Sequence, residues 1–266
     1  MGQLEKQKNF TRLVAFIAFL AAAWTAFSFS FTPLRSSHDE WWHLKTGKWI
    51  MEHRSLPEHD IFTYTADHIE WHNHEWLAQV GMWFVHEQGD RIGWGGIRTV
   101  ILVKSICILL AFVGFGLLLA RYVNDPVWAA LAVMIAVALA RRTFYPRPIF
   151  ITYLLLALIF WLLIQWRAGH QKRPWIWVMI PVFALWSNLH GGWMAGLVMI
   201  GAFWLDALAT VLFPMHRAPS GGRALKNLIN ITILGITCYL AVMINPYGYK
   251  LLMIFNRVLG DAYLMS

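Results

Sequence analysis

Residues 96–120 read GIRTVILVKSICILLAFVGFGLLLA, an apolar run that is followed directly by Arg121. A helix of about 20 apolar residues crosses the hydrocarbon core of a membrane, so this run predicts a transmembrane helix. Other apolar runs bounded by charges lie on both sides of it along the chain. Counting this one, the sequence predicts about seven spans: 13–31, 96–120, 127–140, 149–166, 175–189, 193–213 and 228–244.

The composition excludes a soluble globular domain. Of the 266 residues, 58% are hydrophobic and 14% are charged, whereas about a quarter of the residues of soluble domains are charged. The net charge of +8 is explained by basic cytoplasmic loops, so no nucleic-acid partner is expected. Cys107 and Cys238 both lie in apolar runs, which argues against a disulfide framework or a cysteine metal motif.

The first apolar run has two interpretations. It follows the basic stretch MGQLEKQKNFTR, and a cleaved signal peptide shows the same order of basic and apolar residues. Because the run is long enough to cross a membrane and further spans follow, a retained first helix is the favoured interpretation.

The distribution of basic residues predicts the orientation. Lys and Arg are enriched in cytoplasmic loops, and short loops that carry Arg121 and Arg167 become cytoplasmic when the N-terminus is inside. The segment 33–95, which holds most of the acidic residues, then lies outside. The RRTFYPRP turn and the tail 246–266 lie on the same external side, so the C-terminus is expected outside.

The segment 33–95 predicts two helices at the membrane interface. Residues 39–53 have Trp and Ile side chains among polar ones, with Ser37 or Asp39 as the expected N-cap and Pro57 as the expected end. Trp-rich amphipathic helices with Lys on the polar side lie in the plane of the interface. IFTYT, residues 61–65, predicts a short extended stretch, and 75–87 predicts the second helix.

Several motifs in this order carry a family resemblance. HDEWWHLKTGKWI, LPEHDIFTYT and WHNHEWL are followed by YPRPIFITYLLLAL, LWSNLHGGWMAGL and INPYG. This series resembles the bacterial members of the GT-C superfamily of integral-membrane glycosyltransferases, in the dolichyl-phosphate-mannose mannosyltransferase-like group. Members of that group usually continue with further spans and often a soluble domain, so a complete donor or acceptor site is not necessarily expected within residues 1–266.

The resemblance implies a fold and an activity. It implies an all-α polytopic membrane protein, in which 1–266 forms one GT-C-like module with a long first external loop. The implied activity is inverting transfer of a sugar from a polyprenyl-phosphate-linked donor to an acceptor hydroxyl on the outer face of a bacterial cytoplasmic membrane. Polyprenyl-phosphate sugar and membrane lipids are the expected partners.

Asp39 and Glu40 are the candidate catalytic residues. A carboxylate beside apolar Trp side chains can take a proton from an acceptor hydroxyl, and the resemblance places the catalytic Asp of the family at Asp39. The alternative is that Asp39 only caps the interfacial helix.

A second polar cluster comprises Asp60, His72, His74 and Glu75. With Asp39, these residue types suit a divalent cation such as Mg or Mn, and the candidate ligands are Asp39, Asp60, His74 and Glu75, with His38 and His43 nearby. The spacing fits no defined metal motif. Asp60 and Glu75 could equally orient the acceptor or fix the loop.

Three arginines lie in the RRTFYPRP turn, on the side where positive charge is disfavoured. Arg141, Arg142 and Arg147 are therefore candidate ligands of the donor phosphate, which a guanidinium binds bidentately. Arg147, between two prolines, is the first choice. The alternative is that these side chains only reach towards lipid headgroups.

Polar residues also interrupt the later spans. Asn188 and His190, before a Gly pair, are expected either to line the acceptor site or to bond neighbouring helices. Asp206 is expected to pair with a neighbouring side chain.

Two other classes of function stay open. A GT-C-like module without catalysis could serve as an accessory or scaffold subunit of a larger membrane complex, with its helix faces buried on protein partners. A transporter is the weaker alternative, because ionisable residues are scarce within the spans.

Overall fold

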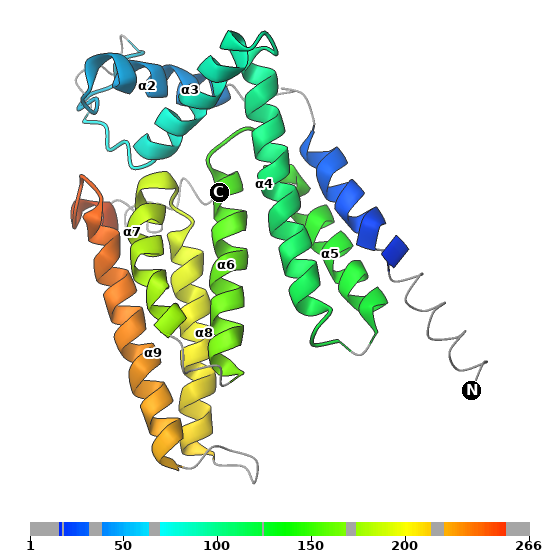
Figure 1. Ribbon diagram of the computed structural model, residues 1–266. Coiled ribbons are helices and arrows are strands. Elements are labelled where there is room, and N and C mark those ends of the chain that lie inside the picture. The colour runs from blue at the N-terminus through cyan, green and yellow to red at the C-terminus, as the bar shows by residue number, and fades with distance from the viewer. Residues whose placement is uncertain are drawn as a thin grey trace, which may run out of the picture. The chain divides into compact units, whose positions relative to one another are not determined.

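Helices make up the regular structure of the described residues. The computed structural model describes residues 16–17, 19–31, 39–63, 70–123, 125–168, 174–213 and 221–253 (Figure 1). Within these ranges the only β-type pairing is an isolated bridge between His59 and Glu70. The predicted all-helical class is confirmed. Residues 13–15, Ser37, His38 and the end of the predicted tail, 254–266, lie outside the described residues.

Five helical segments are long and apolar enough to cross a membrane, which confirms a multi-pass membrane protein. They are α4 (Gly96–Leu119), α5 (Pro126–Ala140) with η1 (Arg141–Thr143), α6 (Ile149–Arg167), α8 (Trp193–Leu212), and α9 (Gly221–Ala241) with η3 (Val242–Ile244). The short predicted span 127–140 reaches this length because η1 continues it to Thr143.

The two other predicted spans form shorter apolar helices in the described part of the chain. One is the first helix, Phe19–Ser30, and the other is Trp175–Leu189, built from η2 (Pro174–Val178) and α7 (Met179–Leu189). The predicted count of seven therefore consists of five helices of spanning length and two shorter ones.

The two helices predicted in the segment 33–95 are present. Helix α2 spans Asp39–His53, the predicted range. It ends before Pro57, because Arg54 adopts a left-handed φ of 53° and its N–H bonds to the Ile50 carbonyl at 2.8 Å. Helix α3 spans Trp76–Arg91 and runs beyond the predicted end at 87, with an ion pair of 2.9 Å between Glu87 and Arg91 in its last turns.

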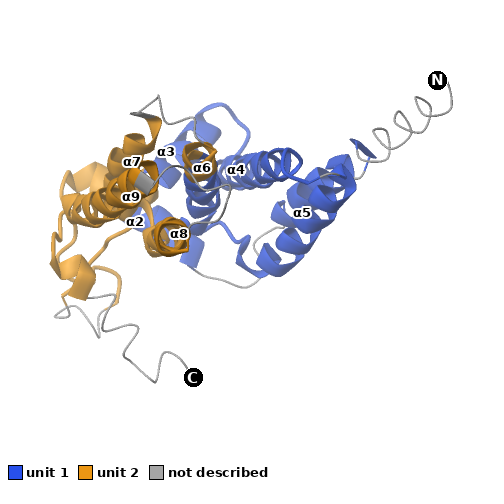
Figure 2. Cartoon of the chain, turned by 90° about the horizontal axis from the view of Figure 1, so that it is seen from below, with its two compact units in different colours: residues 1–47, 81–161 blue, residues 48–80, 162–266 orange. Residues whose placement is uncertain are grey.

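The chain forms two compact units (Figure 2). Unit 1 comprises residues 1–47 and 81–161, and unit 2 comprises residues 48–80 and 162–266. The division falls within α2, α3 and α6, each of which contributes residues to both units.

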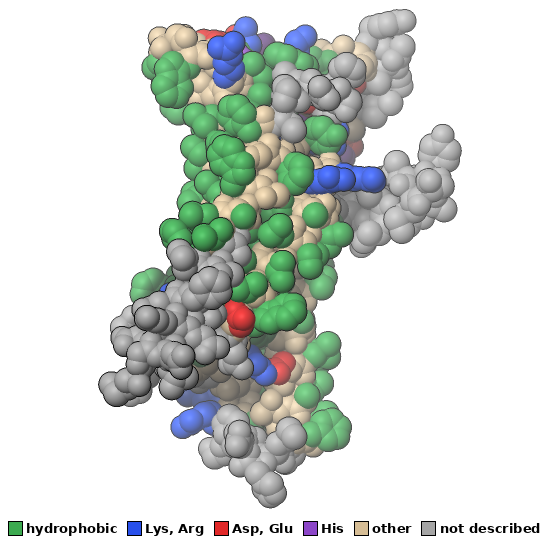
Figure 3. All heavy atoms as spheres, turned by 90° about the vertical axis from the view of Figure 1, so that its right-hand side faces the viewer, with side chains coloured by type: hydrophobic (Ala, Val, Ile, Leu, Met, Phe, Trp, Pro, Cys, Tyr) green, Lys and Arg blue, Asp and Glu red, His purple; other side chains and the backbone are tan. Residues whose placement is uncertain are grey.

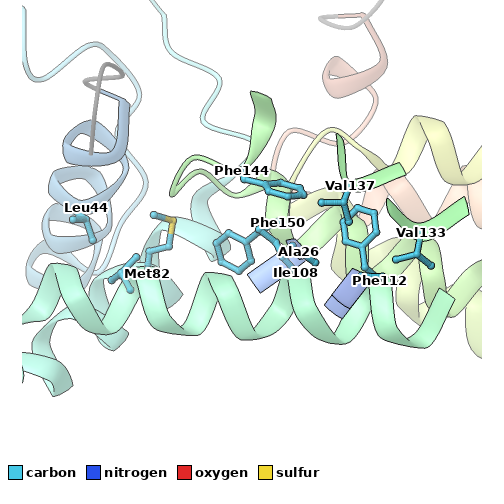
Figure 4. Packing of buried hydrophobic residues seen from close by; sticks show 11 residues of the cluster. Ala26, Leu44, Met82, Ile108, Phe112, Val133, Val137, Phe144 and Phe150 are labelled. Atoms are coloured by element: carbon cyan, nitrogen blue, oxygen red, sulfur yellow. The ribbon is translucent and has the colours of Figure 1, made fainter. Parts of the chain in front are cut away.

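The core of unit 1 forms around the middle of α4. Ile108 and Phe112 of α4 pack with Val133 and Val137 of α5 and with Phe144, all of them buried (Figure 4). Gly116 allows the first helix and α5 to approach α4 closely, because a Cβ atom there would lie 2.8 Å from Phe19 and 2.9 Å from Val133. The core therefore joins the first helix, α4, α5 and the turn after η1.

The core of unit 2 lies among α7, α8 and α9. Phe183 and Trp186 of α7 are fully buried, and a Cβ atom at Gly196 of α8 would lie within 2.8 Å of both rings. Trp204 of α8 donates a hydrogen bond of 2.8 Å to the hydroxyl of Thr232 on α9. These contacts make α7, α8 and α9 a packed group of helices.

Large apolar side chains cover much of the outer surface. Leu139 is 78% exposed, Val198 74% and Trp24 70%, and hydrophobic side chains dominate the face shown in Figure 3. Soluble proteins rarely expose apolar surface this extensive, so these side chains fit contact with lipid tails.

The close packing at Gly116 gives a stability prediction. We expect Gly116→Ala to lower the free energy of unfolding by about 1–3 kcal/mol, because the new methyl group overpacks the contact with Phe19 and Val133. The matched control is Gly114→Ala in the same helix, where an added Cβ meets no atom within 4 Å. Unfolding in detergent, followed by far-UV circular dichroism, measures both variants. Equal midpoints would contradict the packing described for α4.

Candidate functional site

In unit 1 the predicted catalytic acid meets the predicted phosphate-binding arginine. Asp39 is the first residue of α2, and Arg147 lies in the turn between η1 and α6. The Arg147 guanidinium forms an ion pair with the Asp39 carboxylate, with side chains 42% and 55% exposed. The pair is thus accessible at the surface of unit 1, and it joins two segments that are far apart in the sequence.

The turn that carries Arg147 is held by its own backbone and by a buried ring. The Arg147 N–H bonds to the Tyr145 carbonyl at 2.7 Å, and prolines on both sides restrict the backbone. Phe144 is only 1% exposed and anchors the turn in the core. The guanidinium Nε is buried and makes no hydrogen bond within the described part of the protein.

The other two predicted phosphate ligands lie on η1. The Arg141 guanidinium lies over the ring of Phe29, 5.7 Å from its centroid, at the end of the first helix. Arg142 is exposed. Of the three predicted arginines, Arg147 is the one in contact with Asp39, while Arg141 packs on an aromatic ring.

Glu40, the second predicted catalytic residue, has a different environment from Asp39. It is 2% exposed and interacts electrostatically with Lys104 of α4. Lys104 is fully buried, and its ammonium donates a hydrogen bond of 2.7 Å to the Phe144 carbonyl. The sequence-based prediction missed Lys104. A detectable signal existed, because Lys104 is the one charged residue between Arg98 and Arg121 in an apolar run.

In unit 2 the predicted Asn188 lies in a network of amide side chains. Its Oδ1 accepts hydrogen bonds from the Trp76 indole at 2.8 Å and from Asn245 at 3.4 Å. Asn245 also donates to the Ser187 carbonyl at 2.9 Å. These bonds connect α3, α7 and the residues after η3, so Asn188 serves to hold these segments together.

Glu75 lies beside two imidazoles in unit 2. One carboxylate oxygen is 3.5 Å from Nε2 of His190 and 3.8 Å from Nε2 of His74. The His190 Nδ1 accepts a hydrogen bond of 2.9 Å from the Gly192 N–H, so the neutral ring carries its proton on Nε2, facing Glu75. The structure therefore brings together Glu75 and His190, both predicted for the acceptor site.

The Asp60 side chain makes its hydrogen bonds within a local turn. Its carboxylate accepts hydrogen bonds from the Thr63 hydroxyl at 2.5 Å and from the Phe62 N–H at 2.8 Å, which lower the pKa of Asp60 below its ordinary value. Residues 61–63 bend around this carboxylate, so the predicted extended stretch is wrong for this part. Residues 64–65 lie outside the described residues.

The predicted metal ligands do not gather into a cation site in the described ranges. No group of three or more His, Cys, Asp or Glu side chains is placed there to hold a metal ion. Asp39 is paired with Arg147, and Asp60 binds its own turn. Asp39 belongs to unit 1 and the other three candidate ligands to unit 2, so the divalent cation stays a prediction.

Asp206 is paired, as predicted from its position inside an apolar run. Arg167 at the end of α6 binds both carboxylate oxygens, at 2.7 Å through Nε and at 2.8 Å through a terminal nitrogen. This bidentate pair joins α6 to α8 within unit 2.

No protein-family model, no curated protein and no solved structure matches the chain.

The amide network gives a prediction for Asn188. We expect Asn188→Ala to lower the free energy of unfolding by about 1–3 kcal/mol, because Trp76 and Asn245 lose their shared acceptor. Ser105→Ala is the matched control, since its buried hydroxyl bonds within its own helix, to the Ile101 carbonyl. Thermal unfolding in detergent compares the two variants. An equally large loss of stability in Ser105→Ala would show that the network around Asn188 adds nothing specific.

A second prediction concerns pH. Burial lowers the pKa of His74 below its ordinary value of 6.5, and a hydrogen bond to the His72 backbone opposes part of this effect. Below about pH 6.5 the unfolded chain therefore binds a proton that the folded protein does not. The free energy of unfolding decreases as the pH is lowered, until the pH reaches the lowered pKa of the folded protein. We expect the melting temperature to fall when the pH is lowered from about 7 to about 5. The decrease should be smaller in His74→Gln.

The control for this measurement is His53→Gln. His53 is an exposed imidazole that stacks on Trp49 of its own helix. If both substitutions changed the pH dependence equally, His74 would not be its source.

Proposed function

We propose that this protein is a membrane glycosyltransferase of the GT-C type, which transfers a sugar from a polyprenyl-phosphate-linked donor to an acceptor hydroxyl with inversion. One observation carries the proposal: the Asp39 carboxylate and the Arg147 guanidinium form an ion pair at the surface of unit 1. This reaction needs a base for the acceptor and a cation for the leaving phosphate, close to each other.

The exposure of the pair suits an exchange of partners. A half-exposed ion pair contributes only about 0.2–1 kcal/mol, so it is easily replaced. A phosphate offers more negative charge than a carboxylate and can accept two parallel hydrogen bonds from a guanidinium. In the free protein the Asp39 carboxylate thus takes the place of the donor phosphate on Arg147. Donor binding releases Asp39 to face the acceptor.

The transfer is then a single displacement. Asp39 takes the proton of the acceptor hydroxyl, whose oxygen bonds to the anomeric carbon as the bond from that carbon to the phosphate oxygen breaks. The polyprenyl phosphate leaves with the electron pair and is stabilised by Arg147, with Arg141 and Arg142 on the preceding η1 adding positive charge. No step requires a metal ion.

Asn188 uses its side-chain oxygen to hold Trp76 and Asn245 within unit 2, so it is not proposed to bind substrate. The proposed location is the outer face of a bacterial cytoplasmic membrane, with the N-terminus inside.

The proposal predicts opposite effects for the two partners of the ion pair. The probe is farnesyl phosphate, a short polyprenyl monophosphate, titrated onto the protein in nanodiscs and followed by native mass spectrometry. We expect Arg147→Ala to weaken its binding by about tenfold or more, the loss of one charged hydrogen-bonding partner. Asp39→Asn removes the competing carboxylate, so its binding is expected to be equal or tighter, while sugar transfer is lost.

The matched control is Arg91→Ala. It breaks an exposed ion pair with Glu87 that lies within one helix, and we expect unchanged binding. Equal weakening in Arg147→Ala, Asp39→Asn and Arg91→Ala would contradict a phosphate site. A protein partner bound in place of the lipid would favour the alternative function, a non-catalytic scaffold subunit.

A further inference from the structure

Lys104 is a charged residue within a predicted span. It lies in α4, is fully buried, and is one of the largest fully buried side chains of the described residues. An ammonium group inside a membrane span is costly and needs partners from the protein. Its partners therefore indicate what the residue is for.

The partners of Lys104 come from two separate segments of unit 1. The ammonium donates to the Phe144 carbonyl at 2.7 Å, and its electrostatic partner is Glu40, itself 2% exposed. Glu40 follows Asp39 directly in the first turn of α2. Phe144 precedes Arg147 in the turn that leads into α6. Lys104 thus bonds to the segment that carries Arg147, and the buried charge of the residue next to Asp39 acts on it.

From this arrangement we infer that Lys104 and Glu40 are positioning residues, which hold the start of α2 and the Arg147 turn in register so that Asp39 and Arg147 face each other. The inference rests on the proposed function for its role in transfer, but the geometric part stands on the Lys104–Phe144 hydrogen bond and on the burial of both Lys104 and Glu40 in unit 1. Neither residue touches the proposed substrate. They act through the segments that carry Asp39 and Arg147.

Stability alone does not explain the pair. Replacing a buried ion pair with apolar groups of similar volume is often neutral or stabilising, whereas removing one partner leaves a costly unpaired charge. The fold could therefore be kept without the two charges. What an apolar pair could not supply is the hydrogen bond that fixes the Phe144 carbonyl.

The test compares variants that keep or remove this donor. Glu40→Gln with Lys104→Met removes both charges and the donor, while Glu40→Gln with Lys104→Gln removes the charges but keeps an amide donor. Spin labels at Trp41→Cys and Arg142→Cys, both exposed positions, report the distance between the two segments. Cys107→Ala and Cys238→Ala remove the two native thiols.

We expect a narrow distance distribution in the otherwise unchanged protein, a broad one with Lys104→Met and an intermediate one with Lys104→Gln. In unlabelled protein, which keeps Trp41 and Arg142, farnesyl phosphate binding should weaken by about tenfold with Lys104→Met and recover in part with Lys104→Gln. Ser105→Ala is the matched control, because its hydroxyl bonds within α4, to the Ile101 carbonyl.

Each outcome separates the two proposals. A narrow distribution in the folded Lys104→Met double variant would overturn the positioning role. The Lys104→Gln double variant, which lacks both charges, covers the case in which the Lys104→Met variant does not fold. A distance distribution as narrow as that of the unchanged protein would then overturn the role of the two charges. A broadened distribution without any farnesyl phosphate binding by the unchanged protein would leave the positioning role intact and refute the transferase.

Discussion

An ammonium group at the depth of a membrane span must be satisfied by the protein itself, and Lys104 is satisfied by two segments at once. Its ammonium bonds to the Phe144 carbonyl in the turn before α6, and the buried charge of Glu40, in the first turn of α2, acts on it. Both segments also pack on the core of unit 1 through Leu44 and Phe144. The contact between Asp39 and Arg147 depends on this arrangement around α4.

The helices were predictable because their signals are local. Run length and bounding charges predicted the helices of spanning length, and α2 occupies the range predicted from its Trp-rich pattern. The wrong prediction of an extended stretch at 61–63 also has a local cause. The bend at 61–63 follows from the hydrogen bonds of Asp60 to its own turn, which outweigh the strand tendency of Ile61 and Phe62.

The candidate site was only partly predictable. Asp39 and Arg147 were selected for separate chemical reasons, but nothing in their spacing indicates that they touch, since the contact depends on how α2 and the turn before α6 pack on α4. Lys104 was overlooked because a single charged residue changes the mean hydropathy of a long apolar run only slightly. The amide network around Asn188 joins three segments that are distant in the sequence. Contacts of this kind leave no periodic pattern in the sequence from which they could be predicted.

Mutual neutralisation of Asp39 and Arg147 leaves little net charge at their contact. The field of such a pair falls off faster with distance than that of a lone cation, and physiological salt screens what is left over about 8 Å. Abundant anionic phospholipids that diffuse past the turn gain little attraction from Arg147 at a distance. An anion therefore gains most from Arg147 only when it comes close enough to take the place of the Asp39 carboxylate.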